Sequence, residues 1–413
     1  MSSPKIAIIG AGPAGCMLGR ILTLSNVSFT IYESDASPNY RSQGGSLDLH
    51  TGTGLTAMKE AQLWDEYLKH ARFDGDYICM ADKNLKPYIQ MGPSNKLSER
   101  PEIDRAELRR ILTESLPDGS IKWGHRLQRV EEGNTLVFEH TTESGYDLII
   151  GCEGGWSKVR SYIAPEVKPQ YAGVGYHRLT ILDAATTAPN LYKTVNRGNL
   201  FASSNGQRIG IQQMGDGSLN VGWATRRPEN WTQTCKYNPH NINQVKKAIL
   251  EEMDEWSPQL REAIEKAHGS VCDPKNFYML PVGWRWKHRR GATIIGDAAH
   301  LMTPFAGEGV NVAFDDARKL AAAIVRAVQT GGGMDEVDKE VEAFEEEMFP
   351  RMEVYQRQTD EVTKLWFFSE GNMRDVIPKV MLAHIKARVP IVLLPLAWTL
   401  VNSYWFVKTR FFD

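Results

Sequence analysis

The chain has 413 residues, of which 42% are hydrophobic and 24% are charged. These values are ordinary for a globular protein with room for two domains, and a formal net charge of −2 gives no reason to expect a nucleic-acid partner. The five cysteines form no CxxC pair and the histidines do not cluster at metal-ligand spacing, which favours a reducing, cytoplasmic compartment and predicts no metal site.

The first predicted elements form a nucleotide-binding unit, and only five residues precede it, so we expect no cleaved signal peptide. Residues 6–9 are a continuous apolar run typical of a buried parallel strand, a GxGxxG turn and a helix follow, and residues 27–32 form a second strand. Glu33 ends that strand at the spacing where a carboxylate accepts a hydrogen bond from a ribose hydroxyl. The residues expected to hold the dinucleotide are Gly10, Gly12, Pro13, Ala14, Gly15 and Glu33.

The chain then leaves the nucleotide-binding sheet twice, in a short excursion over residues 76–99 and a long one over residues 164–271. The long excursion alternates strand-like runs with turn signals, for example at residues 215–217. This pattern predicts an antiparallel sheet that forms one wall of a substrate chamber. Candidate substrate contacts on the sheet are His177, Gln212 and Met214, and His177 is also a candidate general base.

A later stretch distinguishes a flavin from a nicotinamide. Residues 293–295 predict a third buried strand, and residues 311–324 predict a helix. The loop TPFAGEG between them is rigid at its proline and permissive at its two glycines, so its backbone can lie along a flat ring. Asp297, in the turn after the strand, can accept hydrogen bonds from a polyol chain. FAD has such a ribityl chain and nicotinamide dinucleotides have none, so we expect FAD.

Helical patterns dominate the C-terminal part of the chain. Residues 335–368 form a charged amphipathic pattern, which predicts a helix that bridges the domains. Residues 389–407, VPIVLLPLAWTLVNSYWFV, approach the length of a membrane span, but two prolines, Asn402 and Ser403 argue against one. We expect a buried terminal helix that starts after Pro395, and the alternatives are peripheral membrane contact through residues 389–407 and a true span.

Together these patterns predict a mixed α/β fold. It contains a Rossmann-like FAD-binding domain with a mainly parallel sheet, an inserted substrate domain with an antiparallel β-sheet, and C-terminal helices. The expected ranges are 1–75, 100–163 and 272–330 for the discontinuous FAD-binding domain, 76–99 and 164–271 for the substrate domain, and 331–413 for the bridging and C-terminal helices.

Two motifs resemble those of the class A flavin-dependent aromatic monooxygenases of the para-hydroxybenzoate hydroxylase type. Residues 296–317, GDAAHLMTPFAGEGVNVAFDDA, resemble the second flavin motif of that family, and residues 147–160, DLIIGCEGGWSKVR, resemble its middle motif GADGxxSxVR. In the middle motif Cys152 replaces Ala and Glu153 replaces Asp, which leaves the role of residue 153 open. With the first glycine turn, three motifs of the family stand in the expected order.

Residues 41–67 and 101–112 are similar to the tetracycline-inactivating branch of this family. The branch pattern implies Arg41 near the isoalloxazine, Asp48 at the inner flavin face, and Arg105 beside the FAD ribose or pyrophosphate. From spacing alone each residue has an equally good structural explanation: Arg41 as a solvent-facing loop residue, Asp48 as the cap of a turn, and Arg105 as a charge on a helix surface. The resemblance implies catalytic roles for Arg41, Asp48, Pro304 and Gly307. It implies cofactor contacts from Arg41, Asp48, Arg105, Asp297, Pro304, Gly307, Gly309, Val310 and Asn311, and Phe305 is a candidate substrate contact.

The chemistry that the resemblance implies is aromatic hydroxylation. The sequence holds one GxGxxG and no second Rossmann unit, which fits an enzyme that binds its nicotinamide only transiently. We expect bound FAD, NADPH or else NADH as the transient reductant, and O₂, which forms a flavin C4a-hydroperoxide that hydroxylates a phenolic or polycyclic aromatic molecule. The alternatives are a flavin-dependent halogenase and a flavoprotein that sequesters a polycyclic ligand without turnover.

The substrate is less well defined than the cofactor. Lys193 stands where the branch pattern suggests an uncharged amide, and Val221 stands where it suggests an aromatic side chain. Tetracycline is therefore one candidate among polycyclic or phenolic secondary metabolites. We expect a cytoplasmic protein, with the membrane-associated alternative noted above, that is a monomer or a weak homodimer.

Overall fold

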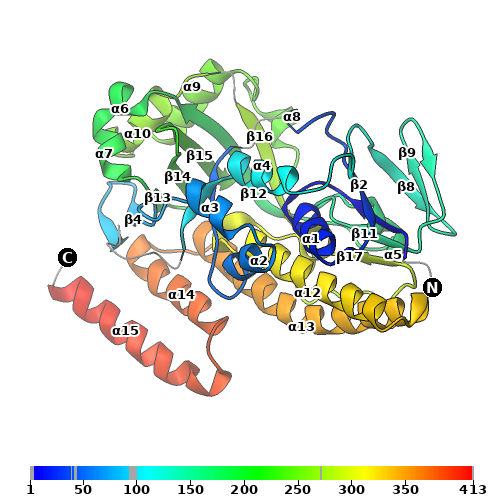
Figure 1. Cartoon of the computed structure of the whole chain (residues 1–413). Helices are drawn as coiled ribbons and strands as arrows, with labels where there is room; N and C mark the ends of the chain where they lie inside the picture. The colour runs from blue at the N-terminus through cyan, green and yellow to red at the C-terminus, as the bar shows by residue number, and fades with distance from the viewer. Residues whose placement is uncertain (1–3, 39, 41–43, 93–99, 270–271, 412–413) are drawn as a thin grey trace. The chain divides into compact units, whose positions relative to one another are not determined.

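The structure is a computed structural model of the chain, and it describes all residues except 1–3, 39, 41–43, 93–99, 270–271 and 412–413 (Figure 1). The chain divides into two compact units, each made of three separate segments. Unit 1 contains residues 1–71, 103–170 and 278–356, and unit 2 contains residues 72–102, 171–277 and 357–413. The C-terminal helices, which the sequence suggested as a separate part, are thus divided between the two units.

The centre of unit 1 is a five-stranded parallel sheet with the strand order β17-β11-β1-β2-β7. The completely buried β1 (Ile6–Ile9) pairs with β11 (Leu148–Gly151) on one side and with β2 (Phe29–Tyr32) on the other. The chain runs from β1 through α1 (Pro13–Leu24) to β2 and reaches β11 only later, so the strand order reverses at β1. Open parallel sheets bind ligands at the carboxyl ends of the strands at such a reversal.

The other elements of unit 1 are β7 and β17, which complete this sheet, and the elements that surround it. They are β3 (Ser46–Asp48), α2 (Gly54–Glu60), α3 (Trp64–His70), α4 (Arg105–Glu114), β7 (Ile121–Lys122), β8 (Leu127–Glu131), β9 (Thr135–Phe138), β10 (Thr142–Glu143), α5 (Lys158–Ile163), β17 (Ala292–Ile294), α11 (Asp297–His300), the 3-10 turn η1 (Pro304–Ala306) and α12 (Gly309–Gln329). Four elements cross the boundary between the units, namely β6 (Glu102–Asp104), β12 (Gln170–Ile181), β16 (Asp273–Met279) and α13 (Gly333–Phe367).

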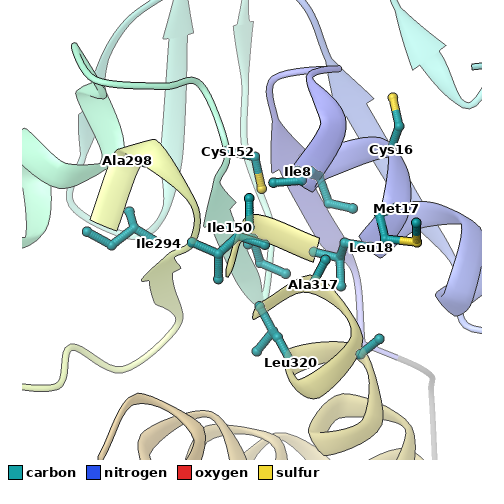
Figure 2. Close-up of a cluster of buried hydrophobic side chains, with 14 of the residues drawn as sticks. Ile8, Cys16, Met17, Leu18, Ile150, Cys152, Ile294, Ala298, Ala317 and Leu320 are labelled. Atoms are coloured by element: carbon teal, nitrogen blue, oxygen red, sulfur yellow. The ribbon is translucent and has the colours of Figure 1, made fainter. Parts of the chain in front are cut away.

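Apolar side chains fix the sheet of unit 1 against its helices. Ile8, Ile150 and Ile294 come from three neighbouring strands, and Figure 2 shows them beside Ala317 and Leu320 of α12. All five residues are fully buried. Branched aliphatic side chains suit a strand that is covered on both faces, and this packing holds the carboxyl ends of the three strands in fixed positions.

Unit 2 is built on a seven-stranded, largely antiparallel sheet with the order β16-β12-β15-β14-β13-β4-β5. One face of this sheet packs on helices and forms a second hydrophobic core. The remaining elements of the unit are β4 (Ile78–Asp82), β5 (Pro87–Met91), β12 (Gln170–Ile181), α6 (Ala184–Thr187), α7 (Pro189–Val195), β13 (Asn199–Ser204), β14 (Gln207–Gln213), β15 (Leu219–Arg226), α8 (Trp231–Thr234), α9 (Ile242–Glu252), α10 (Pro258–Glu265), α14 (Met373–Lys386), the 3-10 turn η2 (Ile391–Leu393) and α15 (Leu394–Phe411). The parallel sheet, the antiparallel sheet and the C-terminal helices confirm the predicted fold class.

The prediction of a buried terminal helix is wrong. The helix α15 begins at Leu394 and includes Pro395 in its first turn, where the missing N–H of a proline costs no intrahelical hydrogen bond. Only Val401 and Trp405 of this helix are buried. Among the described residues, the stretch Ile391–Phe411 is the one that is long and apolar enough to cross a membrane, and 11% of its most apolar part is buried.

Candidate functional site

Two glycines of the turn after β1, Gly10 and Gly15, stand where the surrounding backbone leaves no room for a side chain. Gly10 has φ +104°, and a Cβ there would lie 2.6 Å from the Cys152 carbonyl oxygen. A Cβ at Gly15 would lie 2.1 Å from the Gly10 carbonyl oxygen. Backbone atoms at these distances cannot move aside as a side chain does, so these two glycines are required by packing within unit 1.

Gly12 has no such requirement. Its φ of −77° and ψ of −179° are ordinary extended backbone, and the nearest described atom to a Cβ there is the Cys152 carbonyl oxygen at 3.9 Å. Gly309, at the start of α12, would have no described heavy atom within 4 Å of a Cβ. Both positions are open spaces at the N-termini of helices, where backbone N–H groups and the helix dipole favour an anion. A bound group that passes close to the backbone accounts for glycine at both positions.

The carboxylate of Glu33 closes the glycine-rich turn from the end of β2. Its Oε2 atom accepts a hydrogen bond of 2.7 Å from the Ala11 N–H, and its Oε1 atom accepts one of 2.8 Å from the Asp35 N–H. The side chain is 6% exposed. The Oε1 atom also accepts from the Ser34 hydroxyl at 3.0 Å, so Oε2 is the oxygen with capacity for a further hydrogen bond. Glu33 thus orders the turn and keeps an acceptor, and its contact with a ribose stays a prediction.

The middle motif contacts the first motif through its backbone. The Cys152 N–H donates to the Ile9 carbonyl at 2.7 Å, which places residue 152 against the glycine-rich turn. Glu153 accepts three hydrogen bonds at Oε1, from the Ser157 hydroxyl and from the N–H groups of Lys158 and Val159. It therefore caps α5, and this role explains why a carboxylate stands here. Burial raises its pKa, although those hydrogen bonds act in the opposite direction.

The third motif is held by a buried network of charges that the sequence did not predict. Asp316 of α12 is fully buried, and it accepts from the Gly296 N–H at 3.1 Å, from His300 at 2.5 Å and from Arg351 at 3.1 Å. Burial opposes ionisation of this carboxyl, but the neighbouring histidine and arginine outweigh it and lower the pKa. The network fixes the backbone at Gly296, and this fixes the position of the next residue, Asp297.

Asp297 and Arg105 come from distant segments and act on each other electrostatically. Desolvation by the surrounding protein raises the pKa of Asp297, while the positive charges of His300 and Arg105 oppose that shift. Both Asp297 and Arg105 keep solvent-accessible side chains. An accessible carboxylate beside a guanidinium can accept hydrogen bonds from a polyol and also tolerate a nearby phosphate. Asp297 and Arg105, which the sequence analysis expected at the ribityl chain and at the ribose or pyrophosphate, are thus close enough for the charge of Arg105 to act on the Asp297 carboxyl.

A second cluster, which the sequence analysis found only in part, lies beside the TPFAGEG loop. His50 is buried between two carboxylates, with Nε2 2.8 Å from Asp48 Oδ2 and Nδ1 3.3 Å from Glu308 Oε2. Burial opposes protonation of His50, but its hydrogen bonds to the two carboxylates outweigh burial and raise its pKa. Asn311 joins the cluster to α12, because it accepts from the His50 N–H at 2.7 Å and donates to the Asp48 carbonyl at 2.9 Å.

The structure therefore brings the predicted cofactor residues of unit 1 to one edge of the parallel sheet. Pro304, Gly307 and Gly309 are exposed on the loop, and Phe305 and Val310 are partly exposed. A Cβ at Gly307 would lie 3.9 Å from Asp48 Oδ1, so the loop adjoins the His50 cluster. Arg41 lies outside the described residues. Across the described part of the chain, no group of three or more His, Cys, Asp or Glu side chains is arranged to hold a metal ion.

The predicted substrate residues of unit 2 do not share one face of their sheet. Strand pairing aligns His177 with Trp223, which lies in the hydrophobic core, whereas Gln212 aligns with Asn220 on the opposite face. His177 is 2% exposed and its ring lies 4.9 Å from that of Trp231. Burial lowers the pKa of His177 to about 4, assisted by nearby positive charge. These facts argue against His177 as a solvent-accessible base.

The face that carries Gln212 holds aromatic side chains that the sequence analysis missed. In the register of the sheet Phe201 stands opposite Gly210, and a Cβ at Gly222 would lie 2.4 Å from the Tyr176 hydroxyl oxygen. The two glycines therefore leave room for rings to lie on the sheet. The available signal was the two-residue period of the strands, which separates the faces once the register is known. Met214 follows the end of β14 and is partly exposed.

Comparison with known proteins gives one family and several relatives. The chain matches the family model described as FAD binding domain over residues 4–348. It is 29% identical over 376 residues to Monooxygenase asqM of Emericella nidulans, a match that covers 78% of this chain and 84% of that protein. It is also 29% identical over 399 residues to Monooxygenase penA of Penicillium thymicola, covering 84% and 91% of the two chains.

Solved structures with a similar fold include two whose descriptions name a ligand or an activity. HpxO of Klebsiella pneumoniae, complexed with FAD and uric acid, has a TM-score of 0.74 and 17% identity, with 97% of both chains covered. Tetracycline destructase Tet(55) has a TM-score of 0.70 and 18% identity, with 93% of this chain and 97% of that chain covered. At these identities the similarity establishes the fold.

Proposed function

Because the chain belongs to the FAD binding domain family, we propose that it is an FAD-dependent monooxygenase that uses NAD(P)H and O₂ to hydroxylate a phenolic or polycyclic aromatic small molecule. The observation that carries the proposal is the pair of open glycine positions, Gly12 and Gly309, on two helices whose N-terminal parts both approach Gly296: a Cβ there would lie 3.4 Å from Ala14 Cβ and from Ala313 Cβ. Neither glycine is required by the fold, and a dinucleotide that bears a flat ring would explain both. The names of the two curated relatives agree with oxygen insertion as the reaction.

The residues present fit FAD group by group. Gly12 and the N-terminus of α1 would receive the pyrophosphate, Glu33 would accept from the ribose, and Asp297 would accept from the ribityl chain, with Arg105 close enough to balance negative charge. When bound, FAD supplies electron transfer from a nicotinamide to O₂ and the activated oxygen that is inserted into the substrate.

The protein contributes position and electrostatics beside the ring. The backbone of the loop at Gly307 and Gly309 is accessible, so its N–H groups can stabilise negative charge that develops on a flat ring. His50 holds Asp48 in place through the hydrogen bond at Oδ2, and its ring lies between two carboxylates, whose hydrogen bonds raise its pKa. The family pattern assigns Asp48 and Arg41 to the catalytic centre, and that assignment is part of the proposal.

The partly exposed face of the sheet in unit 2 supports the proposed substrate class. Tyr176 and Phe201 offer ring surfaces, and Gln212 and Asn220 offer amide groups, of which the Asn220 Nδ2 atom donates to Gln212 Oε1 at 3.2 Å. Aromatic surfaces with a few amides recognise flat molecules that carry oxygen substituents. Uric acid and tetracycline, named for two structures of this fold, are fused-ring molecules of that kind. We propose Gln212, Met214 and Phe305 as substrate contacts, and a tetracycline as one candidate substrate.

The test is turnover by the purified protein with its flavin. It should be yellow, and NADPH oxidation, read at the nicotinamide absorbance band, should accelerate when a substrate is added from a panel of tetracyclines and polyketide phenols. Turnover under ¹⁸O₂ should add one labelled oxygen atom to the product. A protein that takes up no FAD, or a product formed without O₂, would exclude the proposal. The proposal places the enzyme in the cytoplasm as a monomer or weak homodimer, with NADH as the alternative reductant.

A further inference from the structure

The helix α15 and the turn η2 before it expose an unusual amount of apolar surface. Eight large apolar side chains in this stretch are more than half exposed, namely Ile391, Val392, Leu396, Trp398, Leu400, Tyr404, Phe406 and Phe411. Soluble monomers scatter such residues singly and seldom gather them on one element. An exposed apolar surface of this size indicates that another molecule covers it.

One side of α15 is already packed within unit 2. Figure 1 shows the helix running beside α14. The buried residues Val401 and Trp405 mark that side, and the indole Nε1 of Trp405 donates to the Arg374 carbonyl at 2.7 Å. The Trp405 ring also stacks on Tyr88, with the ring centroids 6.2 Å apart. The helix is therefore fixed to unit 2 along one face, and its orientation is defined by that contact.

An exposed side of the helix, about a third of a turn from Val401 and Trp405, carries a continuous apolar stripe. Leu396, Leu400, Tyr404, Val407 and Phe411 follow one another at spacings of three or four residues, which places them on one side of a helix, and all five are exposed. Thr399 and Ser403 lie about a quarter turn away from the stripe. The helix thus has a docked side, an apolar stripe and a narrow polar flank, which lies between the stripe and the exposed rings of Trp398 and Phe406.

The charge of this region identifies the occupant. Although the whole chain has a formal net charge of −2, the sequence from Val376 to Phe411 contains no Asp or Glu. Its basic residues stand before and after the apolar stretch and on α14, namely Lys379, Lys386, Arg388, Lys408 and Arg410. Basic residues at both ends of an apolar helix match the negative headgroups of an anionic bilayer, each contributing about 1 kcal/mol near such a surface.

We propose that α15 lies in the plane of an anionic membrane surface, with the stripe from Leu396 to Phe411 buried among the acyl chains. A membrane span would also draw into the bilayer the elements packed on Trp405, namely α14 at Arg374 and β5 at Tyr88. A second copy of the chain would meet the stripe with the same cationic ends. The sequence from Val376 to Phe411 has no carboxylates to pair with them, and Glu361, which lies 2.7 Å from Lys386, is already paired within the chain. An in-plane helix satisfies the docked side, the apolar stripe and the charges together.

The experiment compares two double substitutions on the full-length holoprotein. Leu400→Glu with Tyr404→Glu places two charges in the stripe, and Thr399→Glu with Ser403→Glu places the same charges at the same spacing on the polar flank. All four side chains are exposed, so both variants should fold and keep the flavin absorbance. Binding is measured by co-sedimentation with vesicles of phosphatidylcholine alone and of phosphatidylcholine mixed with phosphatidylserine.

We expect the wild-type protein to bind the mixed vesicles more tightly than the neutral ones. The stripe variant should lose about a hundredfold in affinity, as expected when two apolar side chains no longer enter the bilayer, and the flank variant should lose less than about a tenth of that. Absence of wild-type binding, or equal losses in both variants, would overturn the proposal. So would a dimer in sedimentation analysis that only the stripe variant dissociates, or resistance of the wild-type protein to alkaline extraction from membranes. Vesicle binding needs no turnover, so a failed hydroxylation assay would leave this result intact.

Discussion

The two kinds of glycine in the first motif predict opposite consequences for the same substitution. Gly15→Ala adds a methyl group 2.1 Å from the Gly10 carbonyl oxygen, which is about 0.9 Å inside the 3.0 Å limit that real Cβ atoms respect. Gly12→Ala adds the same methyl group to open space on an unstrained backbone. The first should damage the fold, and the second should damage only cofactor binding.

The magnitudes decide the sign in each case. Helix propensity favours Ala over Gly at residue 15 by about 1 kcal/mol, but overpacking against backbone costs about 3 kcal/mol, so Gly15→Ala should lower the free energy of unfolding by about 2 kcal/mol. At residue 12, the loss of a good N-cap and the reduced freedom of the unfolded chain nearly cancel, so stability should change by less than about 0.5 kcal/mol. If the pyrophosphate passes within contact distance of residue 12, FAD affinity should fall at least about tenfold.

The assay is denaturant unfolding of the apoprotein, followed by titration with FAD. Gly19→Ala is the matched control, because it lies in the same helix and its new methyl group meets only the side chains of Phe29 and Ile31, at 3.0 Å and beyond, which can adjust. Its stability should therefore stay closer to wild type than that of Gly15→Ala. Unchanged FAD affinity in Gly12→Ala would refute the placement of the pyrophosphate, and a Gly15→Ala protein as stable as wild type would refute the close backbone approach.

Three further predictions concern buried polar groups. The raised pKa of His50 stabilises the fold below its ordinary value of 6.5 and this contribution disappears as pH rises through the folded-state pKa, so unfolding measured across pH should show a loss of stability in the wild type that His50→Gln lacks. The pKa of His177 is lowered to about 4, so the fold should lose up to about 3 kcal/mol as pH falls from 6.5 to 4, and His177→Phe should flatten that slope in the same measurement. Arg160 is buried and donates to the carbonyls of Gly155 and Ala298, so Arg160→Met should cost about 2 kcal/mol in denaturant unfolding; no loss would mean that water replaces the guanidinium.

Local sequence patterns were sufficient for the parallel sheet but not for the charges that support it. The strand at residues 6–9 and the glycines after it follow from short-range rules, and the structure has β1 and α1 where they predict them. The cluster of Asp48, His50 and Glu308 joins residues about 260 positions apart in the chain, and no periodicity links them. Only the fold, which brings the loop after η1 to β3, makes the histidine a partner of both carboxylates.

The errors in unit 2 have a different origin, which is that period-two patterns give faces only after the register is known. His177 and Gln212 were grouped because both are polar residues on strands of one sheet, yet the register places one in the core and the other on the opposite face. The terminal helix was predicted as buried because apolar residues usually are, whereas α15 has one docked side and one open side. In both cases the sequence pattern identified the helix or strand correctly, but it did not show which part of the protein packs against each of its faces.

The two units divide the function in a way that accounts for both the clear family and the unclear substrate. The contacts expected for the cofactor in unit 1 use mainly backbone groups at glycines and a few carboxylates, so few sequences satisfy them and the motifs are easy to recognise. The exposed face in unit 2 needs only rings and amides at alternate positions of several strands, and many combinations of side chains meet that requirement. We therefore expect recognition of FAD to be constrained by backbone geometry, and recognition of the proposed substrate to depend on side chains such as Gln212 and Phe201 that can change without disturbing the core behind them.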